Sequence, residues 1–380
     1  MGCHENDPDI SCAGSEERMR RELLASALRP IITDFLDTLN YEPPPKTNTD
    51  ALRAEMLKYA ASSGVPYTGN RHAHQCFMTG LSVATLPRHA AAYGSSHGGL
   101  HLPGPDPFHC HMVPLPLLTL SPPSPLHPHQ QDMYPSQPLE IQLHIGLFTW
   151  LGFLIDDDDD VHLAGPDGLA LFQSRFTAGQ PQPAPVLARF AEVLRRTYAF
   201  WDPVVANLIV LSALAFVSAN ALTAARGGVL RDMAPRVGAG RAWAYHFRNM
   251  EGLPEVYTYF MFPAVSYPDV GVYLQAVPDM GRFINLTNDI LSFYKEEVAG
   301  EVRNYINSLA TYEGKTAMTV LSQVKSETAQ AYLRATEILS GTGQYERAWQ
   351  EYVMGYVKMH LDSSRYLFGE LGLDERVFSN

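Results

Sequence analysis

Apolar residues recur every three or four positions along most of this chain, whereas the alternating pattern of a β-strand is nearly absent. Such spacing gathers apolar side chains on one face of an α-helix. It predicts helices over residues 16–39, 50–62, 72–84 and 139–155, and then over 185–200, 203–225, 239–262, 268–297, 301–311, 315–340 and 343–371. Helices of this kind bury their apolar faces against one another. Because there is also no internal repeat, the pattern predicts one all-α domain over residues 1–380.

Residues 94–138 break the helical pattern with many prolines, scattered histidines and no charged run. Proline removes an amide donor and blocks helix formation. We therefore expect a long, mobile surface loop inserted into a helical chain, not a domain boundary. Two His-X-His pairs, at 109–111 and 127–129, fall in this stretch. Nothing around them would fix the geometry of zinc ligands, so we expect no metal site there.

The formal net charge of -12 argues against nucleic-acid binding, which requires a basic face. It also disfavours direct attraction of a diphosphate unless cations mediate the contact. The four cysteines form no Cys-X-X-Cys pair, and the first residues are acidic where a signal peptide would be basic and then apolar. These features favour a reduced, cytoplasmic protein.

Residues 205–225 carry no charge and are long enough to cross a bilayer as a helix. The segment nevertheless contains several polar side chains, among them Asn207, Asn220 and Thr223, and nothing else in the chain resembles a membrane segment. We therefore expect a buried core helix and no stable membrane insertion.

An almost uncharged segment, residues 139–155, ends abruptly in five consecutive aspartates at 156–160. Negative charge at the carboxyl end of a helix opposes the helix dipole, and carboxylates ~6 Å apart at an effective dielectric of ~20 repel by roughly 3 kcal/mol per pair. Such a cost indicates a counter-charge. Asp156 and Asp160 share one helical face and offer the hard oxygen ligands that Mg²⁺ prefers. Calcium binding or simple solvation would also explain the run when it is considered alone.

A second oxygen-rich pattern follows in residues 288–296. Asn288, Ser292 and Glu296 are spaced four residues apart and therefore line one stripe of a helix whose other residues are largely apolar. An amide, a hydroxyl and a carboxylate can hold Mg²⁺ when an anionic phosphate completes the shell. Lys295, beside Glu296, can reach the same phosphate as a point charge.

At these residues the chain resembles the class I terpene cyclases. The run 156–160 is similar to their DDxxD-type motif, and 288–296 is similar to their NDxxSxxxE motif, especially as it occurs in fungal trichodiene synthases. Residues 354–371 resemble that family's C-terminal helix with its Arg-Tyr pair, here Arg365 and Tyr366. Residues 247–263 resemble its helix with a diphosphate-sensing arginine, here Arg248. The resemblance covers roughly residues 140–371 and extends to longiborneol synthase-type sesquiterpene cyclases. The five-aspartate run is more acidic than the usual motif.

The resemblance implies a class I terpenoid synthase helical bundle that encloses a central active-site cavity. It implies a carbon–oxygen lyase of secondary metabolism that ionises farnesyl diphosphate with three Mg²⁺ ions and cyclises the carbocation. Its implied metal ligands are Asp156, Asp160, Asn288, Ser292 and Glu296. Its implied catalytic residues are Asp156 together with the diphosphate-binding residues Arg248, Lys295, Arg365 and Tyr366. The family is often dimeric, so a homodimer is compatible with the resemblance.

Three other functions remain open at this point. A chain-elongating prenyltransferase has the same architecture but normally carries two aspartate-rich motifs, whereas the second motif here is of the Asn/Ser/Glu type. A cyclase relative could let a non-water nucleophile, such as an amine, capture the cation. The third alternative is a catalytically silent isoprenoid- or calcium-binding protein. Both motifs are complete here, which such a protein would not require. The motifs do not distinguish product skeleton, stereochemistry, or proton loss from water capture.

Overall fold

The computed structural model describes residues 8–44, 49–68, 71–84, 137–156, 166–223, 230 and 233–373. Within these ranges the regular secondary structure is entirely helical, so the all-α prediction is confirmed. The first half comprises α1 (Pro8–Thr38), α2 (Asp50–Ser63), α3 (Arg71–Ala84), α4 (Leu139–Asp156), α5 (Pro166–Ala170), α6 (Phe172–Thr177), α7 (Pro185–Arg196), η1 (Thr197–Ala199) and α8 (Pro203–Thr223). The second half comprises α9 (Arg241–Glu251), α10 (Pro254–Phe260), η3 (Val270–Val272), α11 (Val277–Ala299), α12 (Tyr305–Glu313), α13 (Ala317–Leu339), α14 (Gln344–Asp362), η4 (Ser364–Tyr366) and α15 (Phe368–Leu371).

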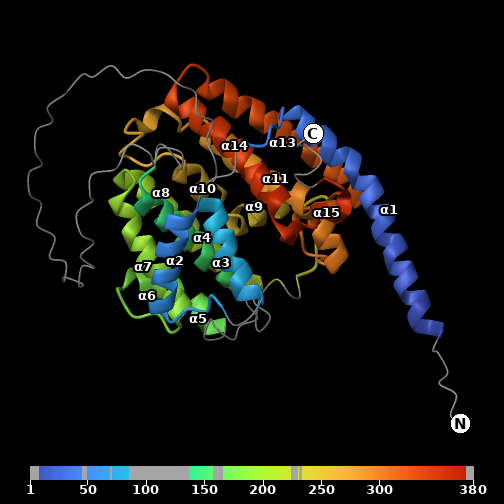
Figure 1. The fold of residues 1–380 in the computed structure, drawn as a ribbon, viewed down its shortest axis with the longest axis horizontal. Helices are drawn as coiled ribbons and strands as arrows, with labels where there is room; N and C mark the ends of the chain where they lie inside the picture. The colour runs from blue at the N-terminus through green and yellow to red at the C-terminus, as the bar shows by residue number, and fades with distance from the viewer. Residues whose placement is uncertain are drawn as a thin grey trace, which may run out of the picture.

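Helices α4 and α11 form the centre of the bundle (Figure 1). Helix α4 packs against α2, α3 and α7, and α11 packs against α10 and α13. Both central helices are buried on most sides: α4 is apolar almost all round, whereas α11 combines a buried apolar surface with a row of polar residues. Because each ends in one of the two predicted metal motifs, the core itself determines where those motifs lie.

The tight contact between α3 and α4 depends on glycine. A Cβ atom added to Gly80 would lie 2.5 Å from the carbonyl oxygen of Gly146 and 2.9 Å from Trp150 Cβ. Phe77 and Trp150 pack edge to face beside this contact, with ring centroids 5.6 Å apart. The close approach of the two backbones fixes the position of α4 and so of its acidic end.

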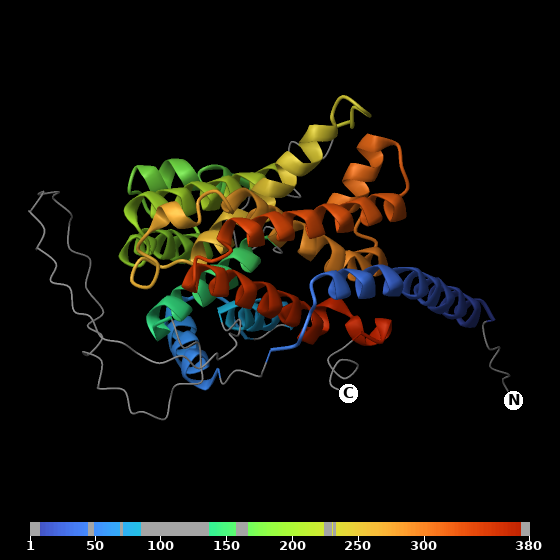
Figure 2. The same ribbon diagram turned by 90° about the horizontal axis from the view of Figure 1, so that it is seen from above.

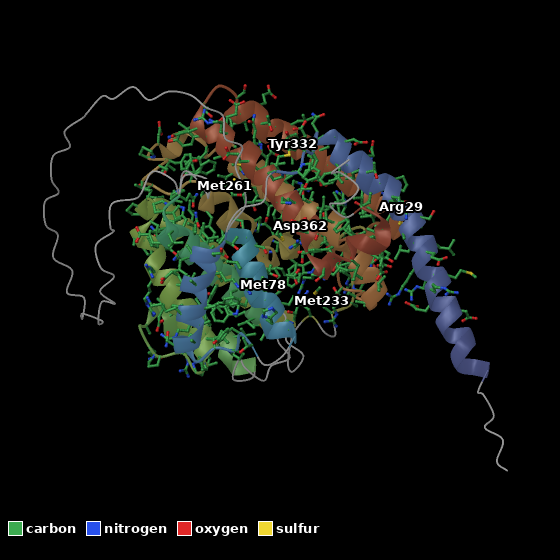
Figure 3. The ribbon with its side chains drawn as sticks, viewed as in Figure 1. Arg29, Met78, Met233, Met261, Tyr332 and Asp362 are labelled. Carbon is green, nitrogen blue, oxygen red and sulfur yellow. The ribbon has the colours of Figure 1, made fainter. Side chains whose placement is uncertain are left out.

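Helix α1 ties the amino-terminal part of the chain to the carboxyl-terminal part. Its later turns pack on α11, α13 and α15, and Arg29 Nε donates a 2.7 Å hydrogen bond to the carbonyl oxygen of Leu371; Figure 3 labels Arg29 beside the carboxyl-terminal helices. The earlier turns of α1 project beyond the rest of the bundle in both ribbon views (Figures 1 and 2).

Several predicted helix boundaries are wrong. The helix predicted over 239–262 is two helices, because Leu253 has a left-handed backbone (φ 53°) and Pro254 has no amide to continue the ladder. The helix predicted over 268–297 is preceded by the short turn η3 and starts only at Val277. The helix predicted over 343–371 stops at Asp362 and continues as η4 and α15. Helices α5 and α6 were not predicted.

Two described helices, α4 and α8, are long and apolar enough to cross a membrane by length and composition. In the fold, 72% of the 18-residue apolar segment of α4 and 56% of that of α8 are buried inside the protein, as in the core helices of soluble proteins. The predicted insertion over 94–138 lies outside the described residues apart from Gln137 and Pro138.

Candidate active site

A cavity of about 340 Å³ lies where α4, the α9–α10 junction, α11 and the segment from α14 to η4 meet. The predicted site residues come together on its wall. Those that line it are Asp156, Arg248, Asn288, Ser292, Lys295, Glu296, Arg365 and Tyr366. Asp160 lies outside the described residues. Asp156, the described residue of the aspartate run, and the second motif, more than 130 positions later in the chain, therefore face one cavity.

Asn288, Ser292 and Glu296, called the α11 stripe below, all line the cavity from one face of α11, as their spacing predicts. Ser292 is buried, and its hydroxyl has no hydrogen-bond partner of ordinary geometry, although it lies near enough to stabilise the Glu296 carboxylate. Burial raises the pKa of Glu296, and the ammonium of Lys295 opposes that shift. Lys295 Nζ lies 3.7 Å from Glu296 and 3.6 Å from Glu301. Lys295 is thus held beside the stripe by two ion pairs, with Glu296 and with Glu301.

Arg248 reaches from α9 to α11, and its side chain is largely buried. Its Nε donates a 2.7 Å hydrogen bond to Asp289 Oδ1, and its Nη2 donates to Asn288 Oδ1 at 3.1 Å. Burial raises the pKa of Asp289, with the Arg248 guanidinium opposing. The predicted diphosphate-binding arginine is therefore in direct contact with the first residue of the second motif.

Three residues with roles in this network were not predicted: Asp289, Glu251 and His360. Glu251 lies at the end of α9 and lines the cavity; burial raises its pKa, Arg248 opposes, and Asp156 adds to the rise. His360 is fully buried on α14 and contacts Asn288. Asp289 follows Asn288 directly and Glu251 lies about one helical turn after Arg248, so their positions could have suggested a role. No local sequence pattern marks His360.

The opposite part of the cavity wall is apolar and aromatic. It includes Phe153, Phe216, Leu253, Tyr257 and Met359. Four other aromatic residues of α10, α11 and the segment between them belong to the core and do not line the cavity: Tyr259, Phe260, Phe262 and Phe283. The Arg365 guanidinium lies 5.4 Å from the centre of the Phe153 ring, where the polar and apolar walls meet.

A second hollow of about 250 Å³ also borders α9. It is lined by Trp243, Phe247 and Tyr305, among others, and it shares Arg248 and Glu251 with the main cavity. Trp243 and Phe247 stack on one another with ring centroids 5.5 Å apart.

The donor set of the main cavity suits a hard cation better than a direct anion site. Its described lining has four carboxylates and three bases, namely Asp156, Glu251, Glu296 and Glu301 against Arg248, Lys295 and Arg365. Within the described residues no group of three or more His, Cys, Asp or Glu side chains is arranged to hold a metal. The candidate ligands are instead the Asn288 amide, the buried Ser292 hydroxyl and the Glu296 carboxylate, with Asp156 from α4. Such hard oxygens fit Mg²⁺.

Relatives of the chain are fungal terpene synthases. The chain is 31% identical to longiborneol synthase CLM1 of Gibberella zeae over 93% of its own length and 90% of that protein. It is 36% identical to terpene synthase BipA of Cochliobolus sativus over 89% of each chain.

Solved structures with the same fold are also terpene synthases. The linalool/nerolidol synthase of Streptomyces clavuligerus in complex with 2-fluorogeranyl diphosphate aligns with a TM-score of 0.54 at 14% identity, covering 86% of this chain and 98% of that one. A variant of cucumene synthase aligns with a TM-score of 0.52 at 13% identity, covering 84% of this chain and 96% of that one. These likenesses confirm the class I terpenoid synthase fold. The model of the trichodiene synthase (TRI5) family matches residues 133–376, which include every predicted site residue. The chain therefore belongs to the trichodiene synthase (TRI5) family of terpene synthases.

Proposed function

We propose that this protein is a magnesium-dependent sesquiterpene cyclase that ionises farnesyl diphosphate, cyclises the resulting carbocation and releases diphosphate. One observation supports the proposal: Asp156 of the aspartate run and the Asn288, Ser292 and Glu296 stripe line one cavity whose remaining wall is largely apolar and aromatic. A ligand that matches this wall has an anionic head and a hydrocarbon tail. The volume of about 340 Å³ lies within the ~300–1,000 Å³ range of small-molecule sites.

The ionisation step requires negative charge to be stabilised on the leaving diphosphate. Asp156, Asp160, Asn288, Ser292 and Glu296 would hold Mg²⁺, three ions by resemblance to the family, which supplies Lewis-acid neutralisation of that charge. Arg248, Lys295, Arg365 and Tyr366 would donate hydrogen bonds to the phosphate oxygens. The guanidinium groups suit this task because their planar forks match phosphate geometry.

The apolar wall would control what happens to the carbocation. Phe153 and Tyr257 line the cavity, and aromatic rings can stabilise positive charge through their π faces. The Tyr257 hydroxyl donates a 3.3 Å hydrogen bond to Oγ1 of Thr149 on α4. This bond directs the polar end of Tyr257 toward α4. Leu253 and Met359 would help to exclude water, which would otherwise quench the cation.

The carboxyl groups of the described wall predict that a diphosphate needs cations in order to bind. Two of the three bases of the wall, Arg248 and Lys295, already pair with carboxyl groups, so they are not free to neutralise several added negative charges, and binding without divalent cations is electrostatically unfavourable. We expect inorganic pyrophosphate to bind measurably by calorimetry when Mg²⁺ is in excess, and not in EDTA. Equal affinity in both buffers would contradict the metal assignment.

The reaction itself is tested by offering the purified protein geranyl, farnesyl and geranylgeranyl diphosphates with Mg²⁺ and analysing volatile products by mass spectrometry. The proposal predicts cyclic fifteen-carbon hydrocarbons or alcohols and stoichiometric diphosphate release. Longer diphosphate products would instead indicate chain elongation. Binding without diphosphate release would indicate a silent binding protein, and an adduct formed only with an added amine would indicate capture by another nucleophile.

A further inference from the structure

The side chain of Asn288 is held at both of its polar atoms. Its Oδ1 accepts from Arg248 Nη2 at 3.1 Å, and its Nδ2 lies 3.1 Å from His360 Nε2. The other ring nitrogen of His360, Nδ1, lies 2.8 Å from the carbonyl oxygen of Tyr356. The four groups form an unbroken chain of hydrogen bonds from α9 through α11 to α14.

Each orientation in this chain follows from what its end groups can do. A guanidinium only donates, so the atom of Asn288 that faces Arg248 must be the oxygen. The amide NH₂ then faces His360, whose Nε2 must accept. A backbone carbonyl only accepts, so His360 Nδ1 must carry the proton that it donates to Tyr356. The network is therefore satisfied by one arrangement of the Asn288 amide and one tautomer of His360.

The ring of His360 is also fixed sterically. It is fully buried, and it lies between Tyr356, with ring centroids 4.7 Å apart at 85°, and Tyr366, with centroids 4.5 Å apart. Tyr356 is itself anchored because its hydroxyl donates to the carbonyl oxygen of Ile284 on α11 at 3.1 Å. Rotation of the imidazole would require both tyrosines to move.

We propose that His360 is a positioning residue that holds the Asn288 amide with its oxygen toward Arg248 and the cavity. This inference rests on the proposed function, in which Asn288 is a metal ligand. The amide oxygen has two lone pairs, and Arg248 uses one of them, so the other stays available to a cation. Without an acceptor at position 360, only Arg248 would orient the amide, and the Asn288 NH₂ group would lose its buried partner, so the oxygen would be held less firmly toward the cation.

Residues behind metal ligands commonly have this effect, and their loss typically lowers metal affinity ~10–100-fold. The test compares His360→Phe, which keeps a planar ring but has no acceptor, with His360→Gln, whose amide oxygen can still accept from Asn288. We measure binding of inorganic pyrophosphate by calorimetry as a function of Mg²⁺ concentration, without substrate turnover. We expect the Mg²⁺ concentration required for half-maximal pyrophosphate binding to rise about tenfold or more in His360→Phe. In His360→Gln it should stay within about threefold of the wild-type value.

His144→Phe is the matched control because His144 is a second fully buried imidazole surrounded by aromatic rings, and it does not line the cavity. It should leave the Mg²⁺ requirement unchanged. Should His360→Phe not fold, as judged by circular dichroism, the smaller His360→Leu replaces it as the acceptor-free variant.

Two outcomes would overturn the inference. One is a wild-type Mg²⁺ requirement in the acceptor-free variant, and the other is an equal loss in His360→Gln, which would make the histidine merely structural. If the wild-type protein itself shows no Mg²⁺-dependent pyrophosphate binding, the proposed function fails instead. Replacing Asn288 by Ala tests whether His360 acts through the Asn288 amide. In an Asn288→Ala background, His360→Phe should cause no further rise in the Mg²⁺ requirement.

Discussion

Glu296 is the carboxylate of the α11 stripe, with only 12% of its side chain exposed beside Lys295. Glu296→Gln keeps the shape and removes the charge that the bound metal would need. We expect turnover of farnesyl diphosphate to fall by roughly a hundredfold or more, since the leaving group loses part of its charge neutralisation. Steady-state diphosphate release measures the effect, and an unchanged helical circular dichroism spectrum checks the fold.

Glu297→Gln is the control for this variant. Glu297 is the next residue on α11, accepts a 2.7 Å hydrogen bond from Asn307 and does not line the cavity. It should retain most of the activity. Near-normal turnover in Glu296→Gln, or an equal loss in both variants, would remove the role assigned to Glu296.

His144 makes stability depend on pH. It is fully buried, and burial, aided by the charge of Arg196, lowers its pKa to about 3. In the unfolded chain a histidine has a pKa of ~6.5. The unfolded state therefore binds more protons between these values, and stability is lost as the pH falls below ~6.5. His360 acts in the same direction, because burial lowers its pKa to about 4.

Each of these histidines should cost about 2 kcal/mol between pH 6.5 and pH 5, at ~1.4 kcal/mol per pH unit. Urea unfolding over this range should therefore show a slope of stability with pH that is ~1.4 kcal/mol per pH unit lower in His144→Gln than in the wild type. Glu251 and Asp289, whose pKa values are raised by burial, act in the opposite direction, but they do so equally in both proteins. His246→Gln, at an exposed position of α9, should leave the slope unchanged. A wild-type slope in His144→Gln would show that His144 is protonated in the folded protein.

The contact between α3 and α4 makes a prediction at the level of elements. Gly80→Ala places a methyl group 2.5 Å from a backbone oxygen of α4, so the two helices must separate. We expect a loss of about 1–3 kcal/mol in the free energy of unfolding. Gly152→Ala is the matched control on α4, because its methyl group would meet only Leu253 Cδ1, at 3.9 Å. Equal stability of both variants in urea titrations would mean that this contact does not limit the packing.

Sequence patterns predicted the helices better than the contacts between them. The spacing of Asn288, Ser292 and Glu296 fixes one stripe of α11, because helical geometry alone decides which residues share a face. The same geometry says nothing about which helix lies opposite. The contacts of Asn288 with Arg248 and with His360 join residues 40 and 72 positions apart. These contacts arise from tertiary packing, and no local pattern encodes them.

The break between α9 and α10 was missed for a different reason. Apolar residues continue with helical spacing on both sides of it, while Gly252 and Pro254 supply the local signal for a stop. The stop places Gly252 where a Cβ would lie 1.9 Å from Asn285 Oδ1 and 2.4 Å from Arg248 Nη1. Only a glycine fits this close approach, so here the local signal was stronger than the periodic one.

For the whole molecule, the Pro/His-rich stretch can be tested as a unit. Ala84 lies against Gly146, since a Cβ on Gly146 would be 3.3 Å from Ala84 Cβ. The start of α4 is seven residues from Gly146, or ~10 Å along a helix, and a few residues of chain span that distance. Deleting residues 98–136 leaves enough chain to connect the helices. We expect unchanged turnover and melting temperature, measured beside the full-length protein, and a large loss of either would assign this stretch a role.

The second hollow gives α9 a mechanical property as well as a chemical one. Protein interiors are normally close-packed, and a group can move only if its neighbours make room. Arg248 and Glu251 border free volume in two directions, so this edge of α9 has room to shift without compressing the core. Hydrogen bonds to α11, and not close packing on every side, therefore hold the arginine that contacts the second motif.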